Sequence, residues 1–102
     1  GTTTCDSLWM GVPVVSLAGH LAVARAGLSI LSNIGLPHLV ATSQQAYVRI
    51  GSRLANDLDN LALLRSSMRE RMLASPLMNA GRFASNVEQL YRRAWQAWCH
   101  AK

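Results

Sequence analysis

Two short apolar runs, separated by one helix-length segment, constrain the fold of this chain more than any other feature. Residues 12–17 hold three valines and a leucine, with Pro13 near the start, and residues 39–41 form a second run. Runs of this length and composition are typical of short buried strands. Residues 20–34, which lie between them, carry apolar side chains on two helical faces and predict a largely buried helix. Two strands connected through a helix indicate a parallel sheet, so we expect an α/β fold.

A short helix is expected before the first strand, over residues 3–10. The threonines at positions 2–4 can act as N-caps, and Asp6 places an acid in the expected first turn. Gly11, with Pro13 two residues later, ends the helix.

Three amphipathic helices are expected after the second strand, over residues 43–55, 58–73 and 79–99. Ser43 can cap the first of them, and Ser75 with Pro76 follows the end of the second. Their predicted inner faces consist of Tyr47, Ile50 and Leu54, then Leu61, Leu64, Met68 and Met72, and finally Phe83, Val87, Leu90, Ala94 and Trp98. The predicted architecture is therefore helix-rich, with two short parallel strands followed by three helices.

The chain is expected to be a piece of a larger domain. Its 102 residues, 50% of them hydrophobic and 15% charged, suffice for one small domain or part of one. Two strands are too few for a stable sheet, and the chain opens on Gly1 rather than Met. We expect the missing strands to lie upstream.

The formal net charge of +5 makes nucleic acid or a phosphate-bearing ligand a candidate partner. The arginines are spread over three predicted helices, however, and stacking aromatic residues do not alternate with them. We therefore interpret them as solvated helix faces and favour a chain that does not bind nucleic acid.

Cysteine spacing and hydropathy indicate the cellular setting. Cys5 and Cys99 lie at opposite ends of the chain and form no CxxC pair, so neither a disulfide framework nor a zinc site is predicted. No apolar run reaches the roughly 18 to 20 residues that span a bilayer. We expect a cytoplasmic protein without a membrane partner.

The start of the chain has the composition of a phosphate-binding turn. Gly1, three threonines and a helix start together offer free backbone N–H groups and hydroxyl donors, and the helix dipole favours negative charge there. Asp6, about one turn further on, could accept hydrogen bonds from ribose hydroxyls. Taken alone, this pattern is more often that of an ordinary helix start.

The same residues carry a specific resemblance. Residues 2–15 read TTTCDSLWMGVPVV and closely resemble the TTTCDALWMGVPVV segment of bacterial O-GlcNAc-transferase-like, or SPINDLY-like, enzymes. The likeness continues through residues 17–19, 35–37 and the turn at 75–77 to a last helix containing Tyr91 and Trp95, and so covers essentially the whole chain.

That resemblance implies a GT-B glycosyltransferase with two Rossmann-like domains, usually preceded by tetratricopeptide repeats. Such an enzyme transfers GlcNAc from UDP-GlcNAc to protein Ser or Thr hydroxyls with inversion and needs no tightly bound metal or other cofactor. Residues 1–75 would be the C-terminal part of its UDP-sugar-binding domain, and residues 76–102 the last helix of that domain. By position, Thr2 and Thr3 would donate hydrogen bonds to the UDP diphosphate and Asp6 would bind the ribose. The catalytic residues would lie before Gly1, so this piece should not catalyse transfer alone.

The segment after Gly19 departs from the family pattern. The family commonly has Ala-Ser-Arg there, whereas this chain has Ala24 before Arg25 and a histidine at position 20. We interpret Arg25 as a structural residue that packs against the nucleotide-binding loop. His20 could face a ligand at this turn, but a lone histidine is more often a surface or capping residue.

Other single residues that could carry chemistry have a structural interpretation. Cys5 lies in the first helical turn, where a thiol can be reactive, but no histidine is near in sequence, so we expect it to pack beneath the phosphate loop. Trp9, Trp95 and Trp98 are interpreted as core or domain-interface residues. No metal-binding spacing links His20, His38 and His100, and no metal is predicted.

One alternative function stays open: the arginine-rich helices after residue 43 could form a protein- or nucleic-acid-interaction module without enzymatic activity. We also expect the last helix to expose Phe83, Leu90 and Trp98 in this piece of the enzyme and so to promote self-association. A monomeric mass at high concentration would contradict that expectation.

Overall fold

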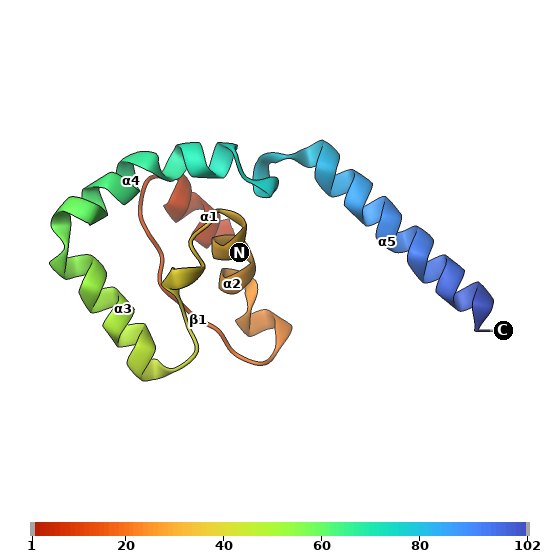
Figure 1. The fold of residues 1–102 in the computed structure, drawn as a ribbon, viewed down its shortest axis with the longest axis horizontal. Coiled ribbons are helices and arrows are strands. Elements are labelled where there is room, and N and C mark those ends of the chain that lie inside the picture. Colours follow the sequence, from red (N-terminus) through yellow and green to blue (C-terminus); the bar gives the residue numbers. More distant parts are fainter. Residues whose placement is uncertain (1, 102) are drawn as a thin grey trace.

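The computed structural model describes residues 2–101 and has a helix-rich α/β architecture (Figure 1). The first half of the chain contains α1 (Thr2–Trp9), β1 (Ser16–Leu17), the 3₁₀ helix η1 (Ala22–Ala24), α2 (Ala26–Asn33), the 3₁₀ helix η2 (Pro37–Leu39) and β2 (Val40–Ala41). The second half contains α3 (Gln44–Asn56), α4 (Leu58–Leu73), the 3₁₀ helix η3 (Pro76–Met78) and α5 (Ala80–His100). The predicted order of elements and the α/β class are confirmed.

The two strands pair in parallel, as predicted. Ser16 lies opposite Val40 and Leu17 opposite Ala41, and the Ala18 N–H extends the pairing by donating to the Ala41 carbonyl at 2.8 Å. The prediction of a strand over residues 12–17 was too long at its start. Pro13 has no N–H to donate, and β2 offers only two residues as a partner, so only the last two residues of the run pair.

The prediction of one helix over residues 20–34 was wrong for the first half of that range. Arg25 has φ −123° and ψ 6°, which separates η1 from α2. Leu21 is 71% exposed and Val23 86% exposed, so these apolar residues do not belong to a buried helical face. Instead, the Gly19 N–H donates to the Ala24 carbonyl at 3.0 Å and closes the segment into a loop.

Glycines end both early helices in the same way. Gly11 and Gly35 each have φ +78°, the left-handed conformation that glycine adopts without strain. After α2, the Leu36 N–H donates to the Leu31 carbonyl at 2.8 Å and the Gly35 N–H to Ser32 at 3.2 Å, which is the Schellman pattern. The side chains of Leu31 and Leu36 are both fully buried, so this turn also contributes to the core.

The core lies between α1, α2, η2 and α4. It consists of Leu8, Leu31, Ile34, Leu36, Leu39, Met68 and Met72. The inward prediction for α4 is confirmed at Met68 and Met72, and Leu64 packs partly buried against them. On α3, Ile50 and Leu54 pack against the core, whereas Tyr47 is 43% exposed and does not belong to the buried face.

Local capping positions the two middle helices. The Ser43 hydroxyl accepts a hydrogen bond from the Ala46 N–H at 3.1 Å, as predicted. Asp57 ends α3 and caps α4, because its carboxylate accepts the Asn60 N–H at 3.3 Å. The boundary between the two helices therefore lies at a residue that serves both.

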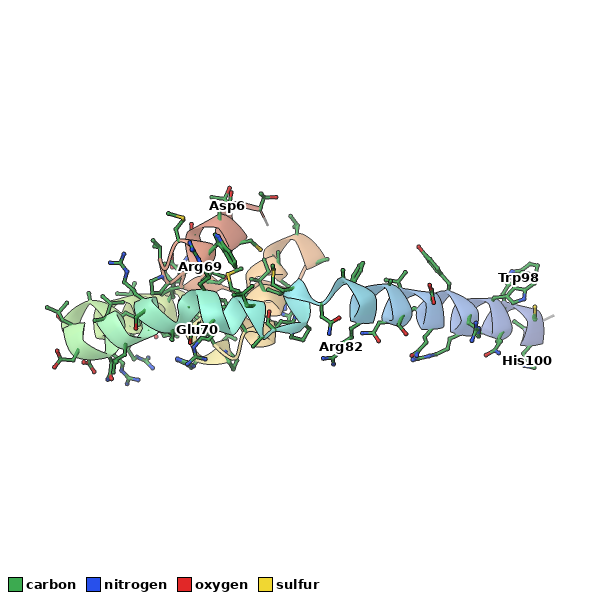
Figure 2. All side chains as sticks on the ribbon, turned by 90° about the horizontal axis from the view of Figure 1, so that it is seen from above. Asp6, Arg69, Glu70, Arg82, Trp98 and His100 are labelled. Carbon is green, nitrogen blue, oxygen red and sulfur yellow. The ribbon has the colours of Figure 1, made fainter. Side chains whose placement is uncertain are left out.

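The last helix, α5, projects away from the rest of the molecule (Figures 1 and 2). The chain extends over 58 × 30 × 18 Å and has a radius of gyration of 16.9 Å, against about 13 Å for a compact domain of this size. Phe83 is 68%, Leu90 58% and Trp98 52% exposed, so the expected exposure of this face is confirmed. Trp95 and Trp98 stack with centroids 5.5 Å apart and do not lie in the core of the described chain, whereas Trp9 packs against it.

Candidate functional site

The predicted phosphate-binding residues lie in the first turns of α1. The helix begins at Thr2, so the threonines at positions 2–4 are inside the first turn rather than caps before it. Asp6 consequently lies in the second turn, and the prediction of an acidic first turn was wrong. The part of the motif at Gly1 falls outside the described residues. Because the first N–H groups of a helix have no intrahelical acceptor, this end still offers backbone donors.

Thr2 and Asp6 share one stripe of α1. They are four residues apart, and residues at this spacing are neighbours on a helix surface. Thr2, Thr3 and Asp6 are all exposed. Figure 2 shows Asp6 at the edge of α1 that points away from α4, and its carboxylate accepts no hydrogen bond from residues 2–101. The hydroxyl and carboxylate groups are thus accessible to a ligand on the same side.

The opposite face of α1 is held by the core. Leu8 is fully buried, and Cys5 and Trp9 pack partly buried against the core cluster. Cys5 therefore packs against the core, as expected of a structural residue, and its place beneath a phosphate loop stays a prediction. Ser7 adds a local hydrogen bond from its hydroxyl to the Thr3 carbonyl at 3.0 Å. One face of α1 is anchored while the Thr2 and Asp6 stripe faces solvent.

Two arginines of α4 hold the C-terminal end of α1. Arg69 Nε donates to the Trp9 carbonyl at 3.1 Å, and the Arg69 guanidinium lies 4.6 Å from the centre of the Trp9 ring. Arg65 Nε donates to the Gly11 carbonyl at 2.9 Å. These cations satisfy carbonyls at the negative end of the helix dipole, where a positive charge is stabilising. We call Arg65 and Arg69 the arginine clamp.

The arginine clamp corrects the interpretation of these arginines as solvated helix faces. Arg65 and Arg69 are exposed, but both bind the backbone of a helix more than fifty positions away in sequence. The available signal was their spacing of four residues, which places both on one side of α4. Nothing local to α4 specifies the end of α1 as their partner.

The loop after β1 lies at the carboxyl end of the parallel strands. Arg25 Nη1 donates to the Gly19 carbonyl at 2.8 Å, which confirms a structural role for Arg25. His20 is exposed in this loop, and its side chain forms no hydrogen bond or ion pair with residues 2–101. Since α1 precedes β1 and connects to its start, the topology directs the N-terminus of α1 toward the same edge, where ligands of parallel sheets bind.

Within residues 2–101, no group of three His, Cys, Asp or Glu side chains could hold a metal ion. His20, His38 and His100 lie in the loop after β1, in η2 and in α5, respectively. No helix in this part of the chain is long and apolar enough to cross a membrane.

Comparison with protein families gives one match that covers most of the chain. The model described as glycosyl transferase family 41 matches residues 1–87. These residues include α1, both strands and the beginning of α5.

Individual relatives point to the same family. The chain is 44% identical over 98 residues to a protein of Arabidopsis thaliana named probable UDP-N-acetylglucosamine--peptide N-acetylglucosaminyltransferase SPINDLY, which covers 96% of this chain and 11% of that protein. It is 33% identical over 97 residues to the UDP-N-acetylglucosamine--peptide N-acetylglucosaminyltransferase of Caenorhabditis elegans, covering 95% of this chain and 8% of that protein. The chain thus spans about a tenth of the length of these relatives.

A solved structure has the same fold. A mutant of the Thermobaculum terrenum O-GlcNAc transferase matches with a TM-score of 0.85 and 39% sequence identity, over 98% of this chain and 19% of that one. The match supports the predicted identity of the chain as part of a GT-B catalytic region.

Proposed function

The chain belongs to glycosyl transferase family 41, and we propose that it forms one wall of a UDP-GlcNAc site in a protein O-GlcNAc transferase. In this proposal Thr2 and Thr3 hold the diphosphate, and Asp6 holds the ribose. The observation that carries it is the exposed stripe of Thr2 and Asp6 at the N-terminus of an otherwise anchored helix.

The diphosphate part of the proposal rests on the chemistry of a helix N-terminus. Free backbone N–H groups and the partial positive charge of the helix dipole attract an anion, and the hydroxyls of Thr2 and Thr3 add donors. Donors fixed in position before the reaction stabilise negative charge as it develops on a leaving group. We therefore assign to this turn the stabilisation of departing UDP, without a metal ion.

The ribose part rests on the position of Asp6. A carboxylate accepts hydrogen bonds and can bind two adjacent hydroxyls at once. Asp6 lies four residues from Thr2, about 6 Å along a helix axis, which is compatible with one ligand that touches both. The arginine clamp supports this assignment, because it fixes α1 from the end opposite to the ligand.

We further propose that transfer to Ser or Thr hydroxyls of acceptor proteins takes place in the longer cytoplasmic protein. Its catalytic groups would come from outside residues 1–102. The isolated chain should accordingly bind UDP without transferring GlcNAc.

The test is calorimetric titration of the full chain with UDP, comparing the Thr2→Val, Thr3→Val and Asp6→Asn variants. Valine keeps the shape of threonine while removing the hydroxyl, and each variant should weaken UDP binding by about tenfold or more, since a hydrogen bond to a charged group contributes about 1.5–3 kcal/mol. Ser85→Ala is the control, because it removes an exposed hydroxyl from α5, to which we assign no nucleotide contact.

Two results would contradict the proposal. Equal affinities of the Thr2→Val, Thr3→Val and Ser85→Ala variants for UDP would show that the two threonines do not contact the nucleotide. Salt-sensitive binding to an oligonucleotide without any response to UDP would favour the interaction module instead. The hydrogen bonds of Arg65 and Arg69 to backbone carbonyls argue against that module, because they engage two of the cations that it would need.

A further inference from the structure

A cavity of about 310 Å³ lies in the angle between α3 and α4, on a part of the chain to which we assign no nucleotide contact. This volume is at the small end of the range of pockets that bind ligands, about 300–1,000 Å³. No residue of α1 lines it. In Figure 1 α3 and α4 form the two arms of this angle.

The floor of this cavity is apolar. Leu36 is almost fully buried beneath it, and Leu54, Leu61 and Leu64 are partly buried along its walls. Aliphatic side chains of a ligand would lose their contact with water here, which contributes about 25 cal/mol for each Å² of apolar surface buried. The floor therefore suits a ligand with an apolar portion.

Its rim is cationic and has free donors. Arg53 comes from α3 and Arg71 from α4, and His38 lies beside them. The Arg53 and His38 side chains form no hydrogen bond or ion pair with residues 2–101. Arg71 bonds only through Nε, to the Ser67 hydroxyl at 3.4 Å, so its two terminal nitrogens stay available within the described chain. A guanidinium group with available nitrogens binds a carboxylate in a bidentate manner, through two parallel hydrogen bonds.

Among the described residues that line the cavity, the one acid, Asp57, is already engaged. Both carboxylate oxygens of Asp57 accept hydrogen bonds from Asn60, one from its backbone N–H and one from its side-chain amide. Asp57 therefore serves as the cap of α4 and does not neutralise Arg53 or Arg71 by a direct ion pair. The charge of the rim favours an anionic ligand.

The residues that line the cavity follow much of α4. Its lining on α4 runs from Asn60 to Arg71, about 16 Å at 1.5 Å per residue. An extended peptide rises about 3.3 Å per residue, so about five residues would match this length. A compact inorganic anion would leave the leucine floor uncovered.

We propose that this groove, bounded by α3 and α4, is a docking site for a short extended peptide segment that carries carboxylates beside aliphatic side chains. Arg53 and Arg71 bind the carboxylates, and the leucine floor receives the aliphatic groups. The groove is separate from the proposed UDP-binding turn, so failure of the proposed function would not overturn this proposal.

The test uses the full chain and a fluorescein-labelled probe peptide, Leu-Asp-Leu-Glu-Leu, with blocked ends. Fluorescence anisotropy should show saturable binding, and amide chemical shifts should change along residues 53–64 while those of α5 do not. Arg53→Gln and Arg71→Gln should each weaken binding about tenfold. Arg92→Gln on α5 removes the same charge far from the groove and should change binding less than twofold.

The matched peptide Leu-Asn-Leu-Gln-Leu separates charge from shape and should bind at least tenfold more weakly. Equal binding of the two peptides would overturn the proposal, as would equal weakening by Arg92→Gln. Displacement of the probe by a twelve-nucleotide thymidine strand as readily as by the unlabelled peptide would assign the groove to polyanions and also overturn it. Circular dichroism of each variant establishes that its helices are retained.

Discussion

The helices α1 and α5 differ in what holds them in place. α1 has 8 residues, too few for a stable isolated helix, yet its inner face is buried and its C-terminal end is bound by the arginine clamp. α5 has 21 residues and leaves most of its apolar side chains exposed. The short helix depends on tertiary contacts, while the long one depends on its own hydrogen bonds. A ligand site needs the first kind of support, because its donors must stay in position.

The largest difference between the two helices is expected on truncation of a leucine. Leu8→Ala should lower the free energy of unfolding by about 2–5 kcal/mol, because Leu8 is fully buried and the change leaves a cavity. Leu90→Ala, at a residue that is 58% exposed on α5, should change it by about 0.5 kcal/mol or less. Urea unfolding followed by circular dichroism measures both. Equal losses would mean that α5 is packed as firmly as α1.

A second contrast lies in the glycines. Gly11→Ala should destabilise the chain by about 1–2 kcal/mol, because Gly11 has φ +78° and a new Cβ would lie 3.1 Å from the Arg65 carbonyl oxygen. Gly81→Ala, in the first turn of α5, should instead stabilise by up to about 1 kcal/mol, since a Cβ there meets only the Asn79 side-chain oxygen at 3.9 Å. Thermal unfolding should move the two midpoints in opposite directions. A higher midpoint for Gly11→Ala would refute the described end of α1.

Loss of an arginine of the clamp should lower the free energy of unfolding by a smaller amount, with the effect concentrated on α1. Arg69→Met keeps the aliphatic stem but removes the donor to the Trp9 carbonyl, and should cost about 1 kcal/mol because the bond is exposed to solvent. Amide hydrogen exchange should accelerate in α1 and stay unchanged in α5. Arg92→Met serves as the control, and the same exchange pattern in both variants would contradict a specific clamp.

The features that were predictable from sequence are local. Ser43 caps α3 through a bond to a residue three positions later, and α4 begins and ends where its apolar spacing and the following Ser-Pro pair indicated. Helix positions and the parallel order of the strands follow from such short-range patterns. So does the exposed stripe of Thr2 and Asp6.

The features that were missed depend on distant partners. The bond from Arg65 to Gly11 spans 54 positions and the one from Arg69 to Trp9 spans 60, and nothing near either arginine specifies such a contact. The break at Arg25 has a similar origin, because the segment before it folds back on Gly19 rather than continuing α2. Close approach of α2 to β1 reinforces this arrangement, since a Cβ on Gly27 would lie 2.7 Å from the Ser16 Cβ.

The start of α1 is proposed to bind the diphosphate and ribose of UDP. Titration of the ¹⁵N-labelled chain with UDP, followed by amide chemical shifts, tests it most directly, with uridine as the ligand that lacks phosphate. UDP should cause saturable shifts confined to residues 2–6, uridine should cause shifts limited to the neighbourhood of Asp6, and neither should shift the amides of α5. Unchanged α1 amides at saturating UDP, or equal shifts in α1 and α5, would contradict it.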